Sequence, residues 1–216
     1  MKIAVIGTGN VGKALGGSFA RAGHDVTFAA QDEAKTRDVA SEVGAAAAAT
    51  AGAAARNADV IVLAVPYAAT QAIAGEIAPF ARDKVVIDVT NPLKPDYSGL
   101  ATEGGPSGAE RLAVPLVGAH VVKAFNTLFA TVQGDPTSLG ATVDALYATD
   151  DADARAAVTA LAESVGFRPI YVGPLTAARE LEALAWLNIR LQMLTNGSWN
   201  TAFVALNAPE AATMAG

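Results

Sequence analysis

A glycine-rich segment near the N-terminus has the spacing of a phosphate-binding turn. The segment is Gly7-Thr8-Gly9-Asn10-Val11-Gly12, which matches G-x-G-x-x-G between a short apolar run and an amphipathic stretch. In such a turn the first glycine permits a sharp bend, the second leaves room for a pyrophosphate, and the third lets helix and strand pack closely. The N–H groups at the helix start then face the anion. The motif predicts a dinucleotide site; a tight turn without a ligand is the alternative.

The residues Ala30-Gln31-Asp32, at the end of the second predicted strand, bear on which dinucleotide would bind. Asp32 lies 20 residues after Gly12, which is where NAD enzymes place a carboxylate on the ribose diol. NADP enzymes place a cation near the 2′-phosphate, and the first cations here are Lys35 and Arg37. The local charge therefore favours NAD. A carboxylate that meets the dipole of the next helix explains Asp32 equally well.

Three further segments are predicted to end strands at the same edge of a parallel sheet, where ligands of open α/β sheets bind. They are Ala64-Val65-Pro66-Tyr67, Asn91-Pro92 and Phe125-Asn126-Thr127-Leu128. Small residues and prolines leave room for a flat ring, and the amides and the Thr127 hydroxyl offer partners for a carboxamide or a flavin-like edge. Tyr67, Phe125 and Phe129 offer aromatic walls. A place in the core is the alternative for both phenylalanines, and it suits Phe129 at least as well.

The sequence lacks an obvious acid, base or metal cluster. All six lysines lie at or before Lys123, and the only histidines, His24 and His120, fit structural roles. A dehydrogenase of alcohols or hydroxy acids needs a proton acceptor at the carbonyl. Hydride transfer between two bound redox cofactors needs mainly proximity and alignment. We therefore expect no catalytic side chain and no metal.

The elements that position these residues alternate between strand and helix. Strands are predicted at 3–6, 25–30, 59–65 and 84–89, helices at 11–21, 33–43 and 68–80, and a short strand and helix within 45–55. This order is typical of a Rossmann-type, doubly wound, mostly parallel sheet. After an irregular stretch at 91–108 we expect helices at 109–116, 127–133, 152–165 and 176–207, the last either continuous or broken at Asn196-Gly197, and strands at 119–125, 142–148 and 168–172.

The chain is predicted to form a dinucleotide-binding domain at 1–135 and a small C-terminal α/β extension at 136–216 that ends in a helical cap. The extension would pack on the same sheet and form the acceptor pocket or a dimer face. Helical spacing of Leu181, Leu184, Ala185, Asn188, Leu191 and Leu194 predicts packing onto the sheet, or else that dimer face. Arg179 is expected to pair with Glu182 rather than with a ligand.

Composition excludes several classes of function. The 216 residues carry a net charge of −6, no cysteine and no basic cluster, so nucleic-acid binding is not expected. The longer uncharged stretches are interrupted by polar residues or proline, which excludes a membrane span. The opening strand runs directly into the glycine turn, unlike a signal peptide. We expect a cytoplasmic protein with small-molecule partners.

Several segments together carry a family resemblance. They are Gly7–Lys13, Val65–Tyr67, Asn91–Lys94, Val122–Thr127, Gly173–Leu175 and Ala178–Glu182. In this order they resemble the F420-dependent NADP oxidoreductase family and the related cytosolic oxidoreductase domain of six-transmembrane metalloreductases, which uses a flavin. The likeness covers about residues 1–190.

The resemblance implies a homodimeric oxidoreductase with NADP on the glycine turn and a deazaflavin (F420) or flavin ring against the nicotinamide. By this likeness Gly9, Asn10 and Val11 hold the pyrophosphate, Val65, Pro66 and Asn91 border the nicotinamide, and Phe125, Asn126 and Thr127 border the second ring. Ala30-Gln31-Asp32 departs from the family, which commonly has Ser-Arg there to clasp the 2′-phosphate. NAD therefore stays open beside NADP, and FMN or FAD beside F420.

Two other functions remain open at this point. One is a sensor or partner protein that binds NAD(P) without turnover; an open cleft lined by Asn91, Phe125 and Asn126 would argue against it. The other is reduction of a C=N (imine) bond, as in relatives of pyrroline-carboxylate reductase, which share the N-terminal fold. That class needs a longer C-terminal helical domain, so the length of 216 residues counts against it.

Overall fold

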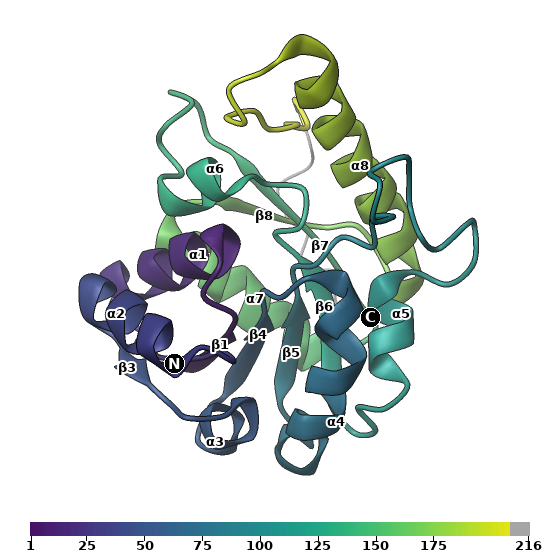
Figure 1. Cartoon of the computed structure of the whole chain (residues 1–216). Helices are drawn as coiled ribbons and strands as arrows, with labels where there is room; N and C mark the ends of the chain where they lie inside the picture. The colour runs from purple at the N-terminus through teal and green to yellow at the C-terminus, as the bar shows by residue number, and fades with distance from the viewer. Residues whose placement is uncertain (208–216) are drawn as a thin grey trace.

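Short apolar runs form one eight-stranded sheet in the computed structural model, which describes residues 1–207 (Figure 1). The strands are β1 (Lys2–Ile6), β2 (Asp25–Ala29), β3 (Ala46–Ala47), β4 (Val60–Leu63), β5 (Val85–Asp88), β6 (His120–Ala124), β7 (Asp144–Thr149) and β8 (Arg168–Tyr171). Their order is β3-β2-β1-β4-β5-β6-β7-β8, and every pair is parallel except β6 and β7. The predicted Rossmann-type, mostly parallel fold is confirmed.

The helices begin and end largely where local chemistry favours it. They are α1 (Asn10–Arg21), α2 (Glu33–Val43), α3 (Ala51–Arg56), α4 (Thr70–Ala81), α5 (Gly108–Ala113), α6 (Ala130–Gly134), α7 (Ala152–Val165) and α8 (Ala178–Thr195), with 3₁₀ turns at Tyr67–Ala69 and Leu175–Ala177. Asp32, Thr50, Ser107 and Asp151 cap α2, α3, α5 and α7 with their side chains. Left-handed Gly44 and Gly166 end α2 and α7.

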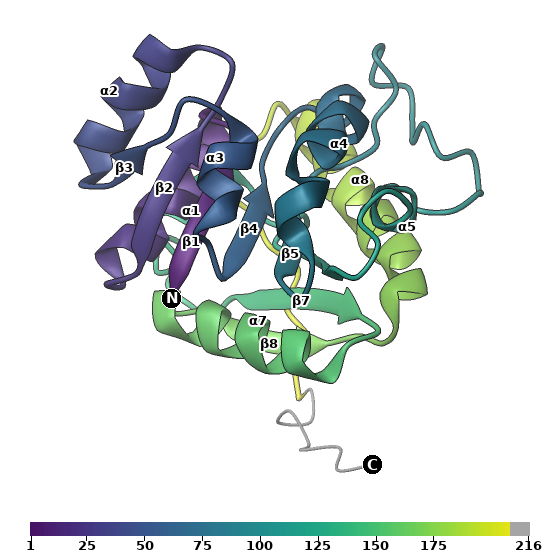
Figure 2. The ribbon, with the colours of Figure 1, turned by 90° about the horizontal axis from the view of Figure 1, so that it is seen from below.

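Two hydrophobic cores lie on opposite faces of the sheet, because successive strand side chains point to opposite sides. In β1, Ile3 and Val5 join the core beneath α1, α2 and α7, whereas Ala4 and Ile6 join the core beneath α3, α4 and α5. Figures 1 and 2 show these two helical layers, with β7 and β8 continuing the sheet beside α7. Since β4 is buried on both faces, its sequence Val-Ile-Val-Leu is apolar throughout.

The C-terminal helix ends at Thr195, next to the break that Asn196-Gly197 offered as an alternative, and the helix predicted beyond that break is wrong. Asn196 adopts a left-handed conformation with φ of 47°, which ends α8, and residues 197–207 contain neither helix nor strand. Side chains of α8 hold this segment: Gln192 Oε1 accepts from the Trp199 N–H, and Asn188 accepts from the Thr201 hydroxyl. The uncharged, polar-rich sequence therefore folds back along α8 rather than extending it.

The remaining boundaries differ little from the predictions. The helix expected at 127–133 begins only at Ala130, and the irregular stretch at 91–108 contains no helix or strand before α5. The division at residue 135 stays a prediction, and residues 208–216 of the predicted extension lie outside the described residues. Within residues 1–207, no helix is both long enough and apolar enough to cross a membrane.

Candidate functional site: two cavities at the glycine turn

The three glycines of the turn between β1 and α1 have different physical roles. Gly7 has φ of +119°, and a Cβ there would overlap the carbonyl oxygen of Ala64, the residue after β4. A Cβ on Gly12 would overlap the carbonyl oxygen of Gly7. The fold itself therefore requires glycine at both positions. Gly9 has ordinary extended backbone (φ −73°, ψ −176°), and nothing lies within 4 Å of where its Cβ would be.

The start of α1 is open to an anion. Gly9 is the N-cap, no side chain of the described chain caps this helix, and its first turn holds no acidic residue. The N–H groups of such a turn, with the positive end of the helix dipole, attract phosphate. Since the protein does not need glycine at position 9, the open space beside Gly9 fits a ligand phosphate that approaches the backbone.

A cavity of about 520 Å³ opens on the β2 side of the turn. It is lined by Gly7, Thr8 and Gly9, by Ala30, Gln31 and Asp32 after β2, and by Ala64, Val65 and Pro66 after β4, together with α2, α3 and α4 residues that include Lys35 and Glu76. Predicted cofactor residues from three separated segments thus line one cavity. Asp32 also caps α2, because its Oδ1 accepts from the Lys35 N–H at 2.9 Å.

A second cavity of about 350 Å³ lies on the other side, between α1 and α8. Its walls come from the ends of β5 and β6 and from α8, and they include Val11, Val89, Asn91, Asn126, Thr127, Leu128, Phe129, Ala185 and Ile189. The ring of Phe129 meets Trp199 edge to face, with centroids 5.2 Å apart. Phe129 therefore forms part of the cavity wall. The sequence alone could not decide between this position and one in the hydrophobic core.

The prediction that Phe125 forms an aromatic wall of the cleft is wrong. Its side chain is fully buried, and its ring packs in the core with centroids 6.1 Å from Phe19 and 6.0 Å from Phe167. The cause is backbone conformation: Phe125 has φ of 60°, so the chain turns sharply at the end of β6. Gln133 Nε2 stabilises this turn by donating to the carbonyls of Phe125 and Leu128.

Two other predicted residues lie near the cavities without lining either. Pro92 is buried. The half-buried Tyr67 ring lies beside Gly108 at the start of α5, and its hydroxyl is 3.5 Å from Arg111 Nη1. Asn10 and Gly12 also line neither cavity, although both belong to the turn that separates them. Of the residues predicted to bind the cofactors, Asn10, Gly12, Tyr67, Pro92 and Phe125 therefore line neither cavity, and the others do.

Asn91 and Asn126 form a reciprocal amide pair at the mouth of β5 and β6. Asn91 Nδ2 donates to the main-chain carbonyl of Asn126, and Asn126 Nδ2 donates to the side-chain Oδ1 of Asn91, both at 2.9 Å. Asn126 Nδ2 also donates to the Leu181 carbonyl of α8 at 3.1 Å. Asn126 Oδ1 is buried and has no hydrogen-bond partner within the described chain. This acceptor is therefore free to take a donor.

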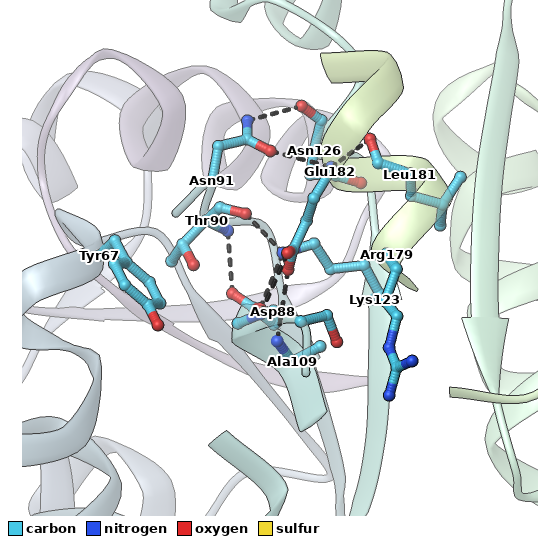
Figure 3. A network of polar contacts seen from close by, with 12 residues as sticks. Tyr67, Asp88, Thr90, Asn91, Ala109, Lys123, Asn126, Arg179, Leu181 and Glu182 are labelled. Carbon is cyan, nitrogen blue, oxygen red and sulfur yellow. Dashed lines mark hydrogen bonds and ion pairs between the residues drawn. The ribbon is translucent and has the colours of Figure 1, made fainter. Parts of the chain in front are cut away.

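Beneath the amide pair lies a buried ion network that the sequence analysis missed (Figure 3). Lys123 Nζ on β6 is 2.9 Å from Asp88 Oδ2 on β5 and 3.0 Å from Glu182 Oε1 on α8, and it also donates to the Thr90 carbonyl. All three charged side chains are at most 1% exposed. Burial raises the pKa of Glu182, and the nearby Lys123 ammonium opposes that rise.

Two side chains near the N-terminal end of α8 fix this helix to the start of α5. Glu182 accepts from the N–H groups of Gly108 and Ala109 at 3.1 and 3.4 Å. Arg179 pairs with Glu110 through two bonds of 2.8 and 2.6 Å, so its predicted pairing with Glu182 is wrong. The Arg179 hydrogen bond lowers the pKa of Glu110 to about 2.

The predicted apolar stripe of α8 is only partly buried. Leu181 and Ala185 are buried, but Leu191 and Leu194 are 44% and 76% exposed. Asn188 of the stripe is buried too, and the buried side of the helix also carries Glu182 and Gln192, which the stripe did not include. The helix thus turns polar side chains toward the site, which hydrophobic spacing alone does not predict.

Neither histidine reaches a cavity. His120 Nδ1 lies 2.9 Å from Asp151 Oδ2, and His24 contacts Ser164 and the N-terminal amine. Within residues 1–207, no group of His, Asp or Glu side chains is arranged to hold a metal ion.

Comparisons with known proteins bear on this geometry. The family model described as "NADP oxidoreductase coenzyme F420-dependent" matches residues 2–92. The F420-dependent NADP reductase of Methanothermobacter thermautotrophicus is 37% identical over 228 residues, covering 97% of each chain. Metalloreductase STEAP3 of Rattus norvegicus is 27% identical over 85% of this chain but only 36% of its own length. The crystal structure of a putative F420-dependent NADP reductase from Arthrobacter superposes with a TM-score of 0.87 at 28% identity, covering 95% and 100% of the two chains.

Proposed function

The chain belongs to the F420-dependent NADP oxidoreductase family and is an oxidoreductase, and we propose that it transfers a hydride between a nicotinamide dinucleotide and the deazaflavin F420. The observation that carries this proposal is the pair of cavities that lie on either side of one glycine turn. Gly7, Thr8 and Gly9 line the larger cavity, and Val11, two residues further on, lines the other.

The residues present fit a dinucleotide in the larger cavity. The open space at Gly9 and the free start of α1 would take the pyrophosphate, with the adenosine ribose toward Gln31 and Asp32. Val65 and Pro66 on one side and Asn91 on the other would border the nicotinamide. When bound, the nicotinamide and the deazaflavin supply and accept the hydride. The role of this chain is to hold the two rings at reacting distance, roughly 3–3.5 Å.

The second ring fits between the amide pair and the Phe129 wall. Asn126, Thr127 and Leu128 supply polar and apolar contacts there, while Ala185 and Ile189 of α8 close the opposite side. Transfer between two aligned rings requires no side-chain nucleophile. This arrangement also favours an enzyme over a sensor without turnover, because the second cavity adjoins the turn.

NADP is the proposed nucleotide, with NAD as a second substrate. Lys35 is the only cation among the described residues that line the larger cavity, and Asp32 and Glu76 oppose it. A 2′-phosphate could pair with Lys35, but the two carboxylates weaken the preference that an arginine at this place would give. We expect NADPH and NADH both to be used, with a modest preference between them.

A spectrophotometric assay tests the proposal. Purified protein is mixed with NADPH or NADH and with F420, FMN, FAD or a cyclic imine, and oxidation of the nucleotide is followed. Bleaching of F420 supports the proposal, and bleaching of a flavin alone would replace F420 by a flavin. Nucleotide binding without turnover of any acceptor would favour a sensor. Turnover of a cyclic imine instead would favour C=N reduction. The homodimer and the cytoplasmic location stay predictions.

A further inference from the structure

The ion network and the amide pair occupy equivalent places on two neighbouring strands. Asp88 and Lys123 are register partners on β5 and β6, and Asn91 and Asn126 each follow three residues later. The chain between them is fixed on both strands. The Thr90 N–H donates to Asp88 Oδ1 at 2.9 Å, and Phe125 turns the end of β6 with its left-handed backbone. The charged pair therefore underlies the segments that carry the amides.

Lys123 holds the β5 segment directly. Its ammonium has three N–H donors, and three acceptors surround it: Asp88, the Thr90 carbonyl and Glu182. The Thr90 carbonyl belongs to the peptide that leads into Asn91, so the position of this amide depends on the ammonium. Because the ammonium is fully buried, no water can replace these contacts.

Glu182 holds the α8 side in the same way. Its carboxylate joins Lys123 to the Gly108 and Ala109 N–H groups, and the preceding residue, Leu181, gives its carbonyl to Asn126 Nδ2. A shift of this turn of α8 would remove one of the two acceptors of the Asn126 amide. The two acceptors together orient the amide and leave Oδ1 without a partner.

We propose that Lys123 and Glu182 are positioning residues that fix the Asn91–Asn126 pair, so that Asn126 Oδ1 accepts a hydrogen bond from a ring N–H of the redox ligand in the second cavity. The inference rests on the proposed function, since the ligand in question is F420. Both residues act through the amides. Neither residue lines either cavity.

The first test measures how firmly the Asn126 side-chain amide is held in the protein without ligand. The side-chain NH₂ exchange of Asn126 is measured by NMR in the wild type and in Lys123→Met, Glu182→Leu and Glu182→Gln. We expect exchange about tenfold faster in the first two variants and about threefold faster in Glu182→Gln, which keeps one acceptor oxygen. The Gln192 side chain, which donates to Thr201 at 2.9 Å, is the internal control and should not change.

The second test measures binding. The dissociation constant for F420 should rise about tenfold in Lys123→Met and Glu182→Leu, as for the loss of one hydrogen bond, while that for NADP stays within about twofold. Asp144→Asn is the matched control. Asp144 is a fully buried carboxylate paired with Arg168 outside the network. It should lower the melting temperature without changing F420 affinity.

Unchanged Asn126 exchange, unchanged F420 affinity, or the same weakening in Asp144→Asn would each overturn the proposal. If Lys123→Met and Glu182→Leu do not fold, the Asn126 exchange rate and the F420 affinity of Glu182→Gln test the proposal instead, because this variant keeps the shape of the side chain and removes one buried charge. A wild type that binds no F420 refutes the proposed function and the role of Oδ1 in binding it. The exchange experiment still shows separately whether the network positions the amides.

Discussion

Replacing Gly9 by valine should separate ligand binding from folding. The backbone at Gly9 is already in a region that valine adopts (φ −73°, ψ −176°), and no atom lies within 4 Å of the new Cβ. Loss of an N-cap glycine costs about 0.5–1 kcal/mol, and the stiffer unfolded chain returns about 0.4–1 kcal/mol. The free energy of unfolding should therefore change by less than about 1 kcal/mol.

Binding should change far more. The side chain would occupy the space at the start of α1 where the pyrophosphate meets the backbone. Losing two charge-assisted N–H bonds of about 1.5–3 kcal/mol each removes about 3–6 kcal/mol, which is at least a hundredfold in the dissociation constant. Isothermal titration with NADPH gives the affinity, and thermal unfolding gives the stability.

Gly12→Ala is the matched control with the opposite pattern. Its Cβ would overlap the Gly7 carbonyl oxygen, so this smaller substitution should destabilise the fold. The reasoning is refuted if Gly9→Val binds NADPH like the wild type, or if it lowers the melting temperature as much as Gly12→Ala does.

Three other perturbations have expected outcomes. Ala30→Ser with Gln31→Arg should shift the preference toward NADPH by about 1.5–3 kcal/mol, measured as the ratio of kcat/KM for the two nucleotides, and no shift would mean that residues 30–32 do not face the 2′-position. The pKa of Glu110 falls from 4.5 to about 2 on folding, so its pairing with Arg179 adds stability that is present above pH 4.5 and lost as the pH falls toward 2; Arg179→Met should flatten this acid limb in urea titrations. Burial raises the pKa of Glu182 above 4.5, so the folded state binds the extra proton and stability falls as the pH rises through the interval above 4.5. Glu182→Gln should lack that fall, and an identical profile would contradict the direction of the shift.

The fold could be predicted because its signals are local and repeated. Apolar runs such as that of β4, separated by helical patterns, specify a parallel sheet, and the glycine turn marks the edge where ligands bind. The ring of Phe125 could not be placed, because its direction depends on a left-handed backbone that a phenylalanine does not indicate. Asn196-Gly197 did mark a possible end of α8, but the course of the chain after it could not be predicted, because side chains of α8 hold the returning segment.

The ion network was missed because each of its members has an ordinary explanation when taken alone. Lys123 stands in the apolar run His-Val-Val-Lys-Ala-Phe, and Asp88 ends the run Val-Val-Ile-Asp. A charge inside a strand that is buried on both faces is costly unless it is paired, so each residue demands a partner of opposite sign. When two such strands carry opposite charges at equivalent positions, we expect them to be neighbours in the sheet. Applied to this sequence, that rule places β5 beside β6 and Asp88 beside Lys123, as the register shows. The third member, Glu182, could not be recognised in the same way, because a charged residue on an amphipathic helix is normally expected to face solvent. Its burial is seen only in the structure, where the buried side of α8 carries several polar residues.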